Sequence, residues 1–356
     1  MPEMTGGQAL VRSLHREGVR VIFGLPGVQL YHFLDALYDE PEIRFITTRH
    51  EQATTYMADG YARASGTVGT ALVVPGPGLQ NASAGLGNAY AASSPVLLIS
   101  GQINRDNIGR DIGILHEVND QLEIVRPVTK WRARALEVRE IPGLVQDAFC
   151  QLRTGRPRPV EIEIPPEALA EVADVEVYEP GKFPADPGDP REIEKAVGLL
   201  VKAQSPVIWA GGGVLASGAW QELQDVAEYL QAPIITTPEG KGAVSDRHHL
   251  SLGVTRGRST GQVRDWLRKY FESCDVALAV GTRFATAEPP ETQNVIQIDV
   301  DEEELGRNHA DTVGILGDAK LVLHQLLDGL KSAAPSRPSR EAELEAMRSQ
   351  RYDPSK

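Results

Sequence analysis

The sequence contains few of the features that mark secreted, membrane-spanning or disulfide-stabilised proteins. Only two of its 356 residues are cysteines, Cys150 and Cys274, and both occur in apolar surroundings. This predicts buried free thiols in a reducing compartment, rather than a disulfide framework, and therefore a cytoplasmic protein. No apolar run is long enough for a transmembrane helix, and residues 1–14 lack the basic and apolar regions of a signal peptide.

Positive charge is also scarce. The chain has 36 lysines and arginines against 49 aspartates and glutamates, which gives a net charge of −13. This balance argues against a general nucleic-acid binder and against an anionic membrane surface, so we expect neither as a partner. An anionic cofactor stays possible, because backbone amides or a metal ion can hold a phosphate locally.

The length and the order of elements predict two α/β domains, each a doubly wound parallel sheet. In residues 1–170, short apolar runs alternate with segments of helical spacing. The expected strands are 19–23, 43–47, 69–74, 96–100 and 160–164, and the expected helices are 6–17, 28–37, a helix from Glu51, 80–92 and 141–152.

A composition change separates the two halves. Residues 171–190 are acidic and then rich in proline and glycine, which predicts a linker. The second domain is expected over 191–331, with strands at 206–210, 233–236, 276–280 and 295–300 and helices at 191–203, 217–230, 261–272 and 320–330. Residues 332–356 form a polar tail, interpreted as a charged helix or a linker to a further domain.

Glu51 is the most informative single residue. An apolar run over 43–46 precedes it and a small-residue helix pattern follows it, so its carboxylate lies where a strand ends and a helix begins. In open α/β sheets this carboxyl edge is where ligands bind. A solvated glutamate favoured by the helix dipole is the alternative interpretation.

Glycine-rich loops follow three of the expected strands: 24–27, 76–78 with Asn81, and Gly101 with Gln102. Glycine permits positive φ and a close approach of the backbone to a ligand. The pattern Gly-x-Gly-x-x-Asn over 76–81 differs by one residue from a dinucleotide fingerprint, but ordinary tight turns explain it equally well. A nicotinamide dehydrogenase is a weaker choice, because the last glycine and the acidic ribose partner are missing.

The run 47–66 around Glu51, with these loops in this order, resembles the thiamine-diphosphate enzymes of the acetolactate synthase, pyruvate oxidase and benzoylformate decarboxylase superfamily. The resemblance implies a pyrimidine-binding domain over 1–170. It implies that Glu51 bonds a ring nitrogen of the cofactor's aminopyrimidine and favours its imino tautomer. The residues that it places on the aminopyrimidine or substrate side are Pro26, Gly27, Gly78, Asn81 and Gln102.

His116 is the second expected catalytic group. The run 113–122, followed by 126–131, also resembles this family, and His116 falls near the catalytic histidine pair of its pyruvate decarboxylase branch. Glu117 replaces the second histidine of that pair. A histidine can act as general acid or base near neutral pH, so His116 and Gln102 are expected to handle substrate protons or orientation. A surface or interface histidine is the alternative.

The middle domain carries a possible nucleotide site. Gly211, Gly212 and Gly213 follow a strand, and Asp299 ends another. Some members of the family hold FAD or an adenine nucleotide in this domain and others leave it empty. The segment 281–288 departs from the pattern of the FAD binders, so a structural domain is favoured over FAD.

The sequence lacks the family's diphosphate motif. It contains no Gly-Asp-Gly and no adjacent asparagines, so no metal ligand is assigned in this chain, and Mg²⁺ would be held by a missing third domain. The resemblance therefore implies the first two of three domains of an acetolactate-synthase-like enzyme that decarboxylates or joins 2-oxo acids. The expected assembly is a homodimer or tetramer whose site needs a third domain or partner subunit, so that the chain alone is inactive. A non-catalytic nucleotide-binding or scaffold subunit is the alternative.

Overall fold

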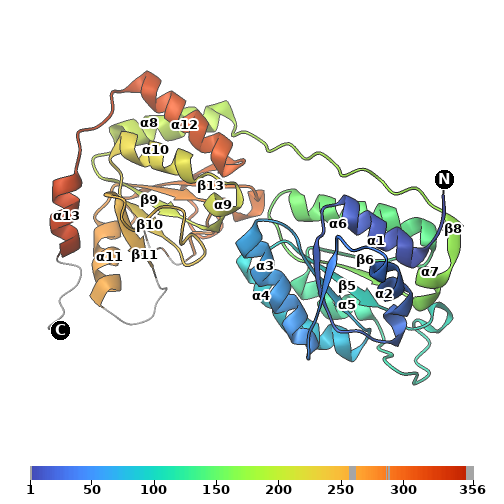
Figure 1. Cartoon of the computed structure of the whole chain (residues 1–356). Helices are drawn as coiled ribbons and strands as arrows, with labels where there is room; N and C mark the ends of the chain where they lie inside the picture. Colours follow the sequence, from blue (N-terminus) through green and yellow to red (C-terminus); the bar gives the residue numbers. More distant parts are fainter. Residues whose placement is uncertain (1, 256–261, 286, 288, 350–356) are drawn as a thin grey trace. The chain divides into compact units, whose positions relative to one another are not determined.

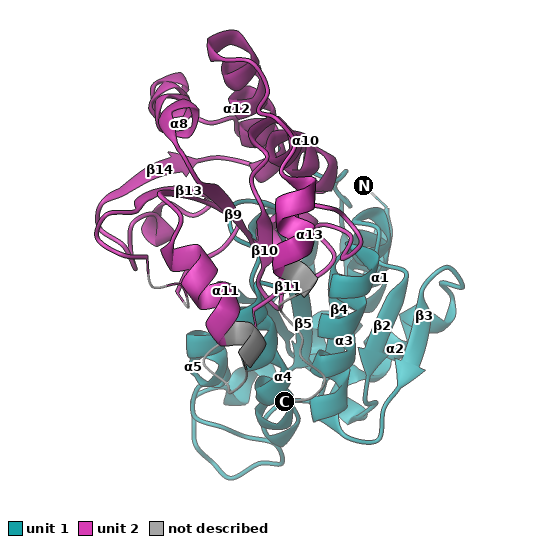
Figure 2. Ribbon diagram, turned by 90° about the vertical axis from the view of Figure 1, so that its left-hand side faces the viewer, with its two compact units in different colours: residues 1–183 teal, residues 184–356 magenta. Residues whose placement is uncertain are grey.

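The protein is seen here in a computed structural model that describes residues 2–255, 262–285, 287 and 289–349. The chain divides into two compact units, Met1–Phe183 and Pro184–Lys356 (Figure 2). Each unit contains one six-stranded parallel sheet between helices (Figure 1). The predicted fold class, two doubly wound parallel-sheet α/β domains, is confirmed.

The sheet of the first unit has the strand order β3-β2-β4-β5-β7-β6. Its strands are β2 (Val21–Gly24), β3 (Arg44–Thr47), β4 (Gly69–Val73), β5 (Val96–Gly101), β6 (Trp131–Arg134) and β7 (Val160–Ile164). From β2 the chain first moves outward to β3 and then returns to the other side, to β4. The switch point of the sheet therefore lies between the carboxyl ends of β2 and β4, where ligands bind in such folds.

Two hydrophobic clusters cover the two faces of this sheet. One face packs against α1 (Gly6–Arg16), α2 (Tyr31–Tyr38), α6 (Ile141–Arg153) and α7 (Pro166–Ala170). The other packs against α3 (Glu51–Ser65), α4 (Pro77–Ala92) and α5 (Gln121–Val125). The alternation of side chains along each strand divides the core in this way, since successive residues point to opposite faces.

The sheet of the second unit has the order β11-β10-β9-β12-β13-β14. Its strands are β9 (Pro206–Ala210), β10 (Ile234–Thr236), β11 (Ser251–Val254), β12 (Val276–Val280), β13 (Asn294–Asp299) and β14 (Thr312–Leu316). The helices are α8 (Pro190–Lys202), α9 (Gly212–Ala216), α10 (Trp220–Leu230), α11 (Gln262–Glu272), α12 (Ala319–Ala333) and α13 (Glu341–Ser349). The expected first residue of α11, at position 261, lies outside the described residues.

Several elements differ from the sequence-based expectation. The start of the expected linker forms β8 (Val172–Asp174), which pairs antiparallel with β1 (Glu3–Thr5). The helix expected over 217–230 begins only at Trp220, as α10, because Gly218 before it has a φ of +64°, and the short helix α9 ahead of this turn was not predicted. The helix expected from Val28 begins with a 3-10 turn, Val28–Leu30. The edge strands β6, β11 and β14 were not predicted.

The described part of the polar tail packs on the second unit instead of extending as a free linker. Leu344 of α13 is fully buried in the core of that unit. The Arg337 guanidinium donates to the carbonyls of Leu200 and Ala203, at 2.8 and 2.7 Å. The rest of the tail, 350–356, lies outside the described residues.

Both cysteines are free thiols. Cys274 is buried, as predicted, whereas Cys150, near the C-terminal end of α6, is only half-buried, so that part of the prediction is wrong. Among the described helices, none combines the length and the apolar character that crossing a bilayer requires.

Candidate active site

Four of the predicted residues lie together at the switch point of the first sheet: Glu51, Asn81, Gly27 and Gly78. Glu51 is the first residue of α3, and its half-buried carboxylate lies at the positive end of the helix dipole. The Asn81 side chain on α4 donates from Nδ2 to Glu51 Oε2 at 3.0 Å. Among the described residues, no donor bonds Glu51 Oε1, so this oxygen is available to a ligand.

Val74, the residue after β4, explains why Gly27 and Gly78 are glycines. A Cβ atom on Gly27 would lie 2.2 Å from Val74 Cγ1, and one on Gly78 would lie 2.6 Å from Val74 Cγ2. The Gly78 position is also 3.7 Å from Glu51 Cγ. The glycines thus let the loops after β2 and β4 close around Val74 beside the carboxylate. Pro26 is exposed in the first of these loops.

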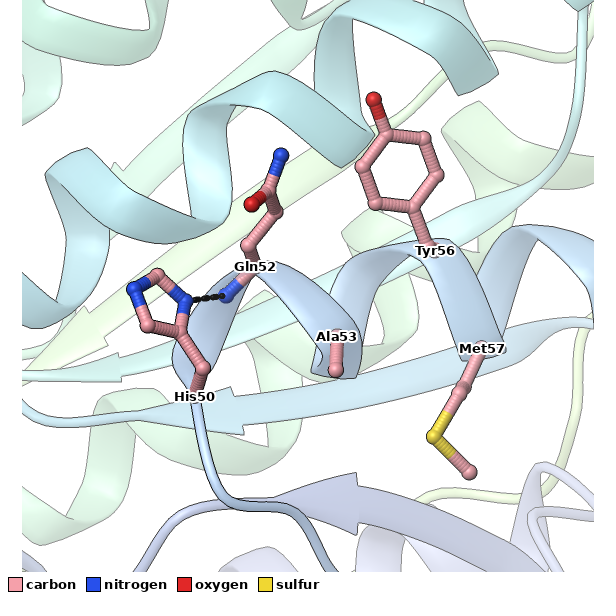
Figure 3. A pocket seen from close by; sticks show the side chains of 5 residues that line it. All are labelled: His50, Gln52, Ala53, Tyr56 and Met57. Carbon is pink, nitrogen blue, oxygen red and sulfur yellow. Dashed lines mark hydrogen bonds between the residues drawn. The ribbon is translucent and has the colours of Figure 1, made fainter.

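The start of α3 is capped locally. His50 has an extended backbone, and its Nδ1 accepts a hydrogen bond from the Gln52 amide at 3.2 Å (Figure 3). A shallow hollow on this helix is lined by His50, Gln52, Ala53, Tyr56 and Met57. Because Tyr56 and Met57 are exposed, the surface beside Glu51 is partly apolar.

The His116 loop reaches the same edge of the sheet. A Cβ atom on Gly76 would lie 2.3 Å from the His116 carbonyl oxygen, so the loop rests on the turn before α4. His116 itself has a φ of +70°, which is uncommon for a residue with a side chain. Its Nδ1 is 2.9 Å from Gln29 Nε2, a contact that the sequence did not predict.

Glu117 holds this loop in shape. Its carboxylate accepts hydrogen bonds from the amides of Ile112 (3.2 Å), Gly113 (2.5 Å) and Ile114 (3.1 Å). Desolvation acts to raise the pKa of Glu117, but these backbone bonds outweigh it and lower the pKa below its ordinary value. Glu117 is therefore a residue that shapes the loop, and its bonds to the backbone favour the ionised carboxylate.

Gln102 is buried, with both ends of its carboxamide bonded within the protein. Its Nε2 donates to Glu163 Oε1 at 3.2 Å, and its Oε1 accepts from the Ile103 amide at 2.7 Å. Gln102 thus contacts a buried polar cluster behind the sheet edge, and no hydrogen bond joins it to Glu51 or His116 in the described chain.

That cluster was missed by the sequence analysis. Glu161 and Glu163 on β7 are both fully buried, together with Ser100 and Gln121. Ser100 Oγ donates to Glu161 Oε1 at 2.5 Å, and Glu163 is ion-paired with Arg134. The signal was present in the alternating run 160–164, but alternation normally indicates a strand with one solvated face. Here both faces are covered.

Burial governs the protonation of the two carboxyl groups. Desolvation, followed by repulsion from Glu163, raises the pKa of Glu161 well above its ordinary value. Desolvation also raises the pKa of Glu163, although Arg134 opposes the shift. Glu161 therefore favours the neutral acid, while Glu163 has a cation beside it.

The second unit positions Gly211, Gly212 and Gly213 at its own switch point, between β9 and β12. The Gly211 and Gly213 amides donate to the carbonyls of Val280 and Gly281, each at 2.9 Å. Two of the three glycine amides of the predicted nucleotide site therefore already donate hydrogen bonds within the protein. Asp299 is buried, and its Oδ1 accepts from the Asp301 amide at 3.1 Å. Positions 286 and 288 of the segment 281–288 lie outside the described residues.

The residues at the Glu51 site fit an aminopyrimidine. A carboxylate with one oxygen held by Asn81 and one available suits a planar ring that presents nitrogen atoms, and the adjacent glycines leave the backbone accessible. Across the described ranges, no three His, Cys, Asp or Glu side chains are grouped so that they could hold a metal ion.

Comparison with known proteins gives two family matches. Residues 4–124 match the thiamine pyrophosphate enzyme N-terminal TPP-binding domain, and residues 193–326 match the central domain of thiamine pyrophosphate enzymes. The first match contains Glu51, Asn81 and His116, and the second contains the glycines after β9.

Curated relatives align along nearly the whole chain. A probable acetolactate synthase large subunit of Methanocaldococcus jannaschii is 39% identical over 341 residues, which cover 92% of this chain and 56% of the relative. An acetolactate synthase isozyme 3 large subunit of Escherichia coli is 33% identical, with coverages of 95% and 60%. A probable 2-ketoarginine decarboxylase of Pseudomonas aeruginosa is 35% identical, with coverages of 93% and 59%. The chain thus spans between half and two thirds of the length of these relatives.

Proposed function

The chain belongs to the thiamine pyrophosphate enzyme family, and on that premise we propose that it forms part of an enzyme acting on 2-oxo acids. The proposed reaction is decarboxylation, carboligation or both, as in acetolactate synthase. The observation that carries this proposal is the Glu51 carboxylate at the start of α3, held through one oxygen by Asn81 at the switch point.

Each residue of the site has a proposed task toward the cofactor. Bound thiamine diphosphate would supply the electron sink that bond cleavage beside a carbonyl requires. Glu51 would bond a ring nitrogen of the aminopyrimidine through Oε1 and hold a proton there, while Asn81 keeps the carboxylate oriented. The backbone at Pro26, Gly27 and Gly78 would border the ring, since side chains at both glycines would meet Val74.

His116 is the proposed proton-transfer group toward the substrate. Its Nδ1 contacts Gln29, whereas no described residue bonds Nε2. The Nε2 atom is therefore the ring position that can exchange a proton with a bound 2-oxo acid. Gln102 is proposed to support the site without contacting the substrate, because its carboxamide already bonds Glu163 and the Ile103 amide.

We propose that the site is completed by a third domain or a partner subunit, in a homodimer or tetramer. The relatives are longer than this chain, and the surface of α3 beside Glu51 exposes Tyr56 and Met57. The Mg²⁺ ion and the diphosphate would be held by that third domain. On this view, the chain alone binds the cofactor weakly and does not turn over.

The test is release of CO2 from a 2-oxo acid such as pyruvate, with the third domain supplied as a separate polypeptide. We expect Glu51→Gln to reduce the rate by about 10²- to 10⁴-fold, the range for loss of a general acid–base group. Glu40→Gln in the same unit, at a half-buried glutamate, is the matched control and should keep the full rate. Equal rates in both variants would instead favour a non-catalytic scaffold subunit, and turnover by the chain alone would refute the shared site.

A further inference from the structure

Gln121 links the turn before α4 to the interior of the sheet. Its Oε1 accepts from the Gly76 amide at 2.9 Å, and its Nε2 lies 2.9 Å from the Gly101 carbonyl oxygen and 2.9 Å from Glu163 Oε2. The orientation of this carboxamide is determined, because an amide N–H only donates and a carbonyl or carboxylate oxygen only accepts. Gln121 is 1% exposed, so water cannot replace these bonds.

The Gly76 turn in turn sets the start of α4. Gly76 is the N-cap residue of this helix, and its carbonyl accepts the first helical hydrogen bond, from the Gln80 amide at 3.0 Å. Asn81, which follows Gln80 in α4, donates a hydrogen bond from its side-chain amide to Glu51 Oε2. A shift of the turn would therefore move the amide that orients the Glu51 carboxylate.

Among the described residues, no cation forms an ion pair with Glu161, in contrast to Glu163. Across from it on β6, Arg132 donates its guanidinium to Glu123 at 3.1 Å, while Arg134 pairs with Glu163. Among the described residues, Glu161 Oε2 has no hydrogen-bond partner. A fully buried carboxylate with one neutral donor is costly, so the neutral acid is favoured.

The charged groups that face the pair come from two elements. Strand β6 contributes Arg132 and Arg134, and the α5 segment contributes Asp120 and Glu123, of which Asp120 lies 3.8 Å from the Arg134 guanidinium. Strand β5 contributes only neutral side chains across from the two glutamates, Leu98 and Ser100. The two arginines thus have other carboxylates beside them, and a second negative charge on β7 would be poorly compensated.

We propose that Gln121 is a positioning residue of the Glu51 site, and that Glu161, kept as a neutral acid, holds Ser100, Glu163 and Gln121 in the arrangement that anchors the Gly76 amide. The role assigned to Glu51 rests on the proposed function, but the anchoring does not. Ionisation of Glu161 adds a second negative charge beside Glu163, separates the members of the cluster and releases the turn.

The first test measures hydrogen exchange of glycine amides in the full chain labelled with ¹⁵N-glycine. We expect Gln121→Leu to lower the protection of the Gly76 amide at least tenfold, while Gly69, whose amide bonds the Pro95 carbonyl at 3.0 Å, stays protected. Gln151→Leu on α6 is the matched control and should change neither amide. Unchanged protection at Gly76, or an equal loss at Gly76 and Gly69, would overturn the proposal.

The second test follows the same amide against pH. In the wild-type chain, protection of the Gly76 amide should fall as the pH rises and Glu161 ionises, whereas in Glu161→Gln it should stay constant. A fall of equal size in both proteins, or in neither, would contradict the assignment.

Addition of thiamine diphosphate should shift the Gly27 and Gly78 resonances. No shift, combined with the expected behaviour of Gly76, would refute the proposed function while leaving the anchoring intact.

Discussion

At the scale of single residues, the site depends on how one carboxylate is held. Glu51 could be identified from sequence because a strand, a helix start and a long family-like run all meet there. Its partner Asn81 was also predicted, since the glycine pattern 76–81 ends on it. The contact of Gln29 with His116 was not predictable, because 87 positions separate the two residues and only the folded loops bring them to 2.9 Å.

Loss of the Asn81 amide should weaken cofactor binding. A hydrogen bond to a charged group contributes about 1.5–3 kcal/mol, so Asn81→Ala should reduce the affinity for thiamine diphosphate by about 10- to 100-fold. Calorimetric titration of the chain would measure this. The exposed Asn294→Ala in the second unit is the control, and an affinity equal in both variants would contradict the assigned role.

Glu161 should make stability depend on pH. Its pKa is raised in the folded chain, so the folded state binds this proton more tightly than the unfolded state does. The wild type therefore loses stability as pH rises from the unfolded pKa, about 4.3, toward the folded pKa. Glutamine does not titrate, so the advantage of Glu161→Gln over the wild type should grow with pH in urea unfolding. An advantage that is constant with pH would refute the assignment.

At the scale of elements, periodicity predicted the central strands and the long helices, because their apolar residues recur at the spacing of buried faces. The edge strands β6 and β14 were missed because they are only partly buried and carry polar residues. The cluster on β7 was missed for the opposite reason. Its alternating glutamates suggest a strand with one face in solvent, yet α5 packs against β7 and β6 pairs with it, so both side chains are fully buried.

Helices α3 and α4 pack closely against each other (Figure 1). This packing predicts that alanine substitution changes the stability in opposite directions at two glycines. A Cβ atom on Gly85 would lie 2.2 Å from Thr55 Oγ1, which donates to the Ala82 carbonyl. Gly85→Ala should therefore destabilise the chain by about 1–3 kcal/mol. Gly60 on α3 has no atom within 4 Å of its Cβ position, so Gly60→Ala should stabilise by about 0.5–1 kcal/mol. Urea denaturation that ranks the two variants in the reverse order would contradict this packing.

At the scale of the whole molecule, two units with separate cores form one chain. The composition of 171–190 predicted a linker, but β8 could not be foreseen there, since its partner β1 lies more than 160 residues earlier. The packing of α13 on the second unit could not be predicted from the sequence either. Its sequence is highly charged, and the buried contact depends mainly on Leu344.

Leu344→Ala should therefore destabilise the second unit. Removal of a fully buried leucine side chain costs about 2–5 kcal/mol, and scanning calorimetry should show a lower unfolding temperature for that unit. Leu321→Ala on α12 removes a side chain that is 37% exposed and should cost clearly less. Equal effects of the two variants would mean that α13 does not dock as described.

The central claim is that the Glu51 carboxylate activates the cofactor. The most direct measurement is the rate at which the thiazolium C2 proton of thiamine diphosphate exchanges with deuterium, with saturating cofactor and the third domain supplied. We predict that Glu51→Gln slows this exchange by about 10²- to 10⁴-fold, while Glu40→Gln leaves it at the wild-type rate. Exchange at the wild-type rate in Glu51→Gln would contradict the claim and leave Glu51 as a helix-start residue.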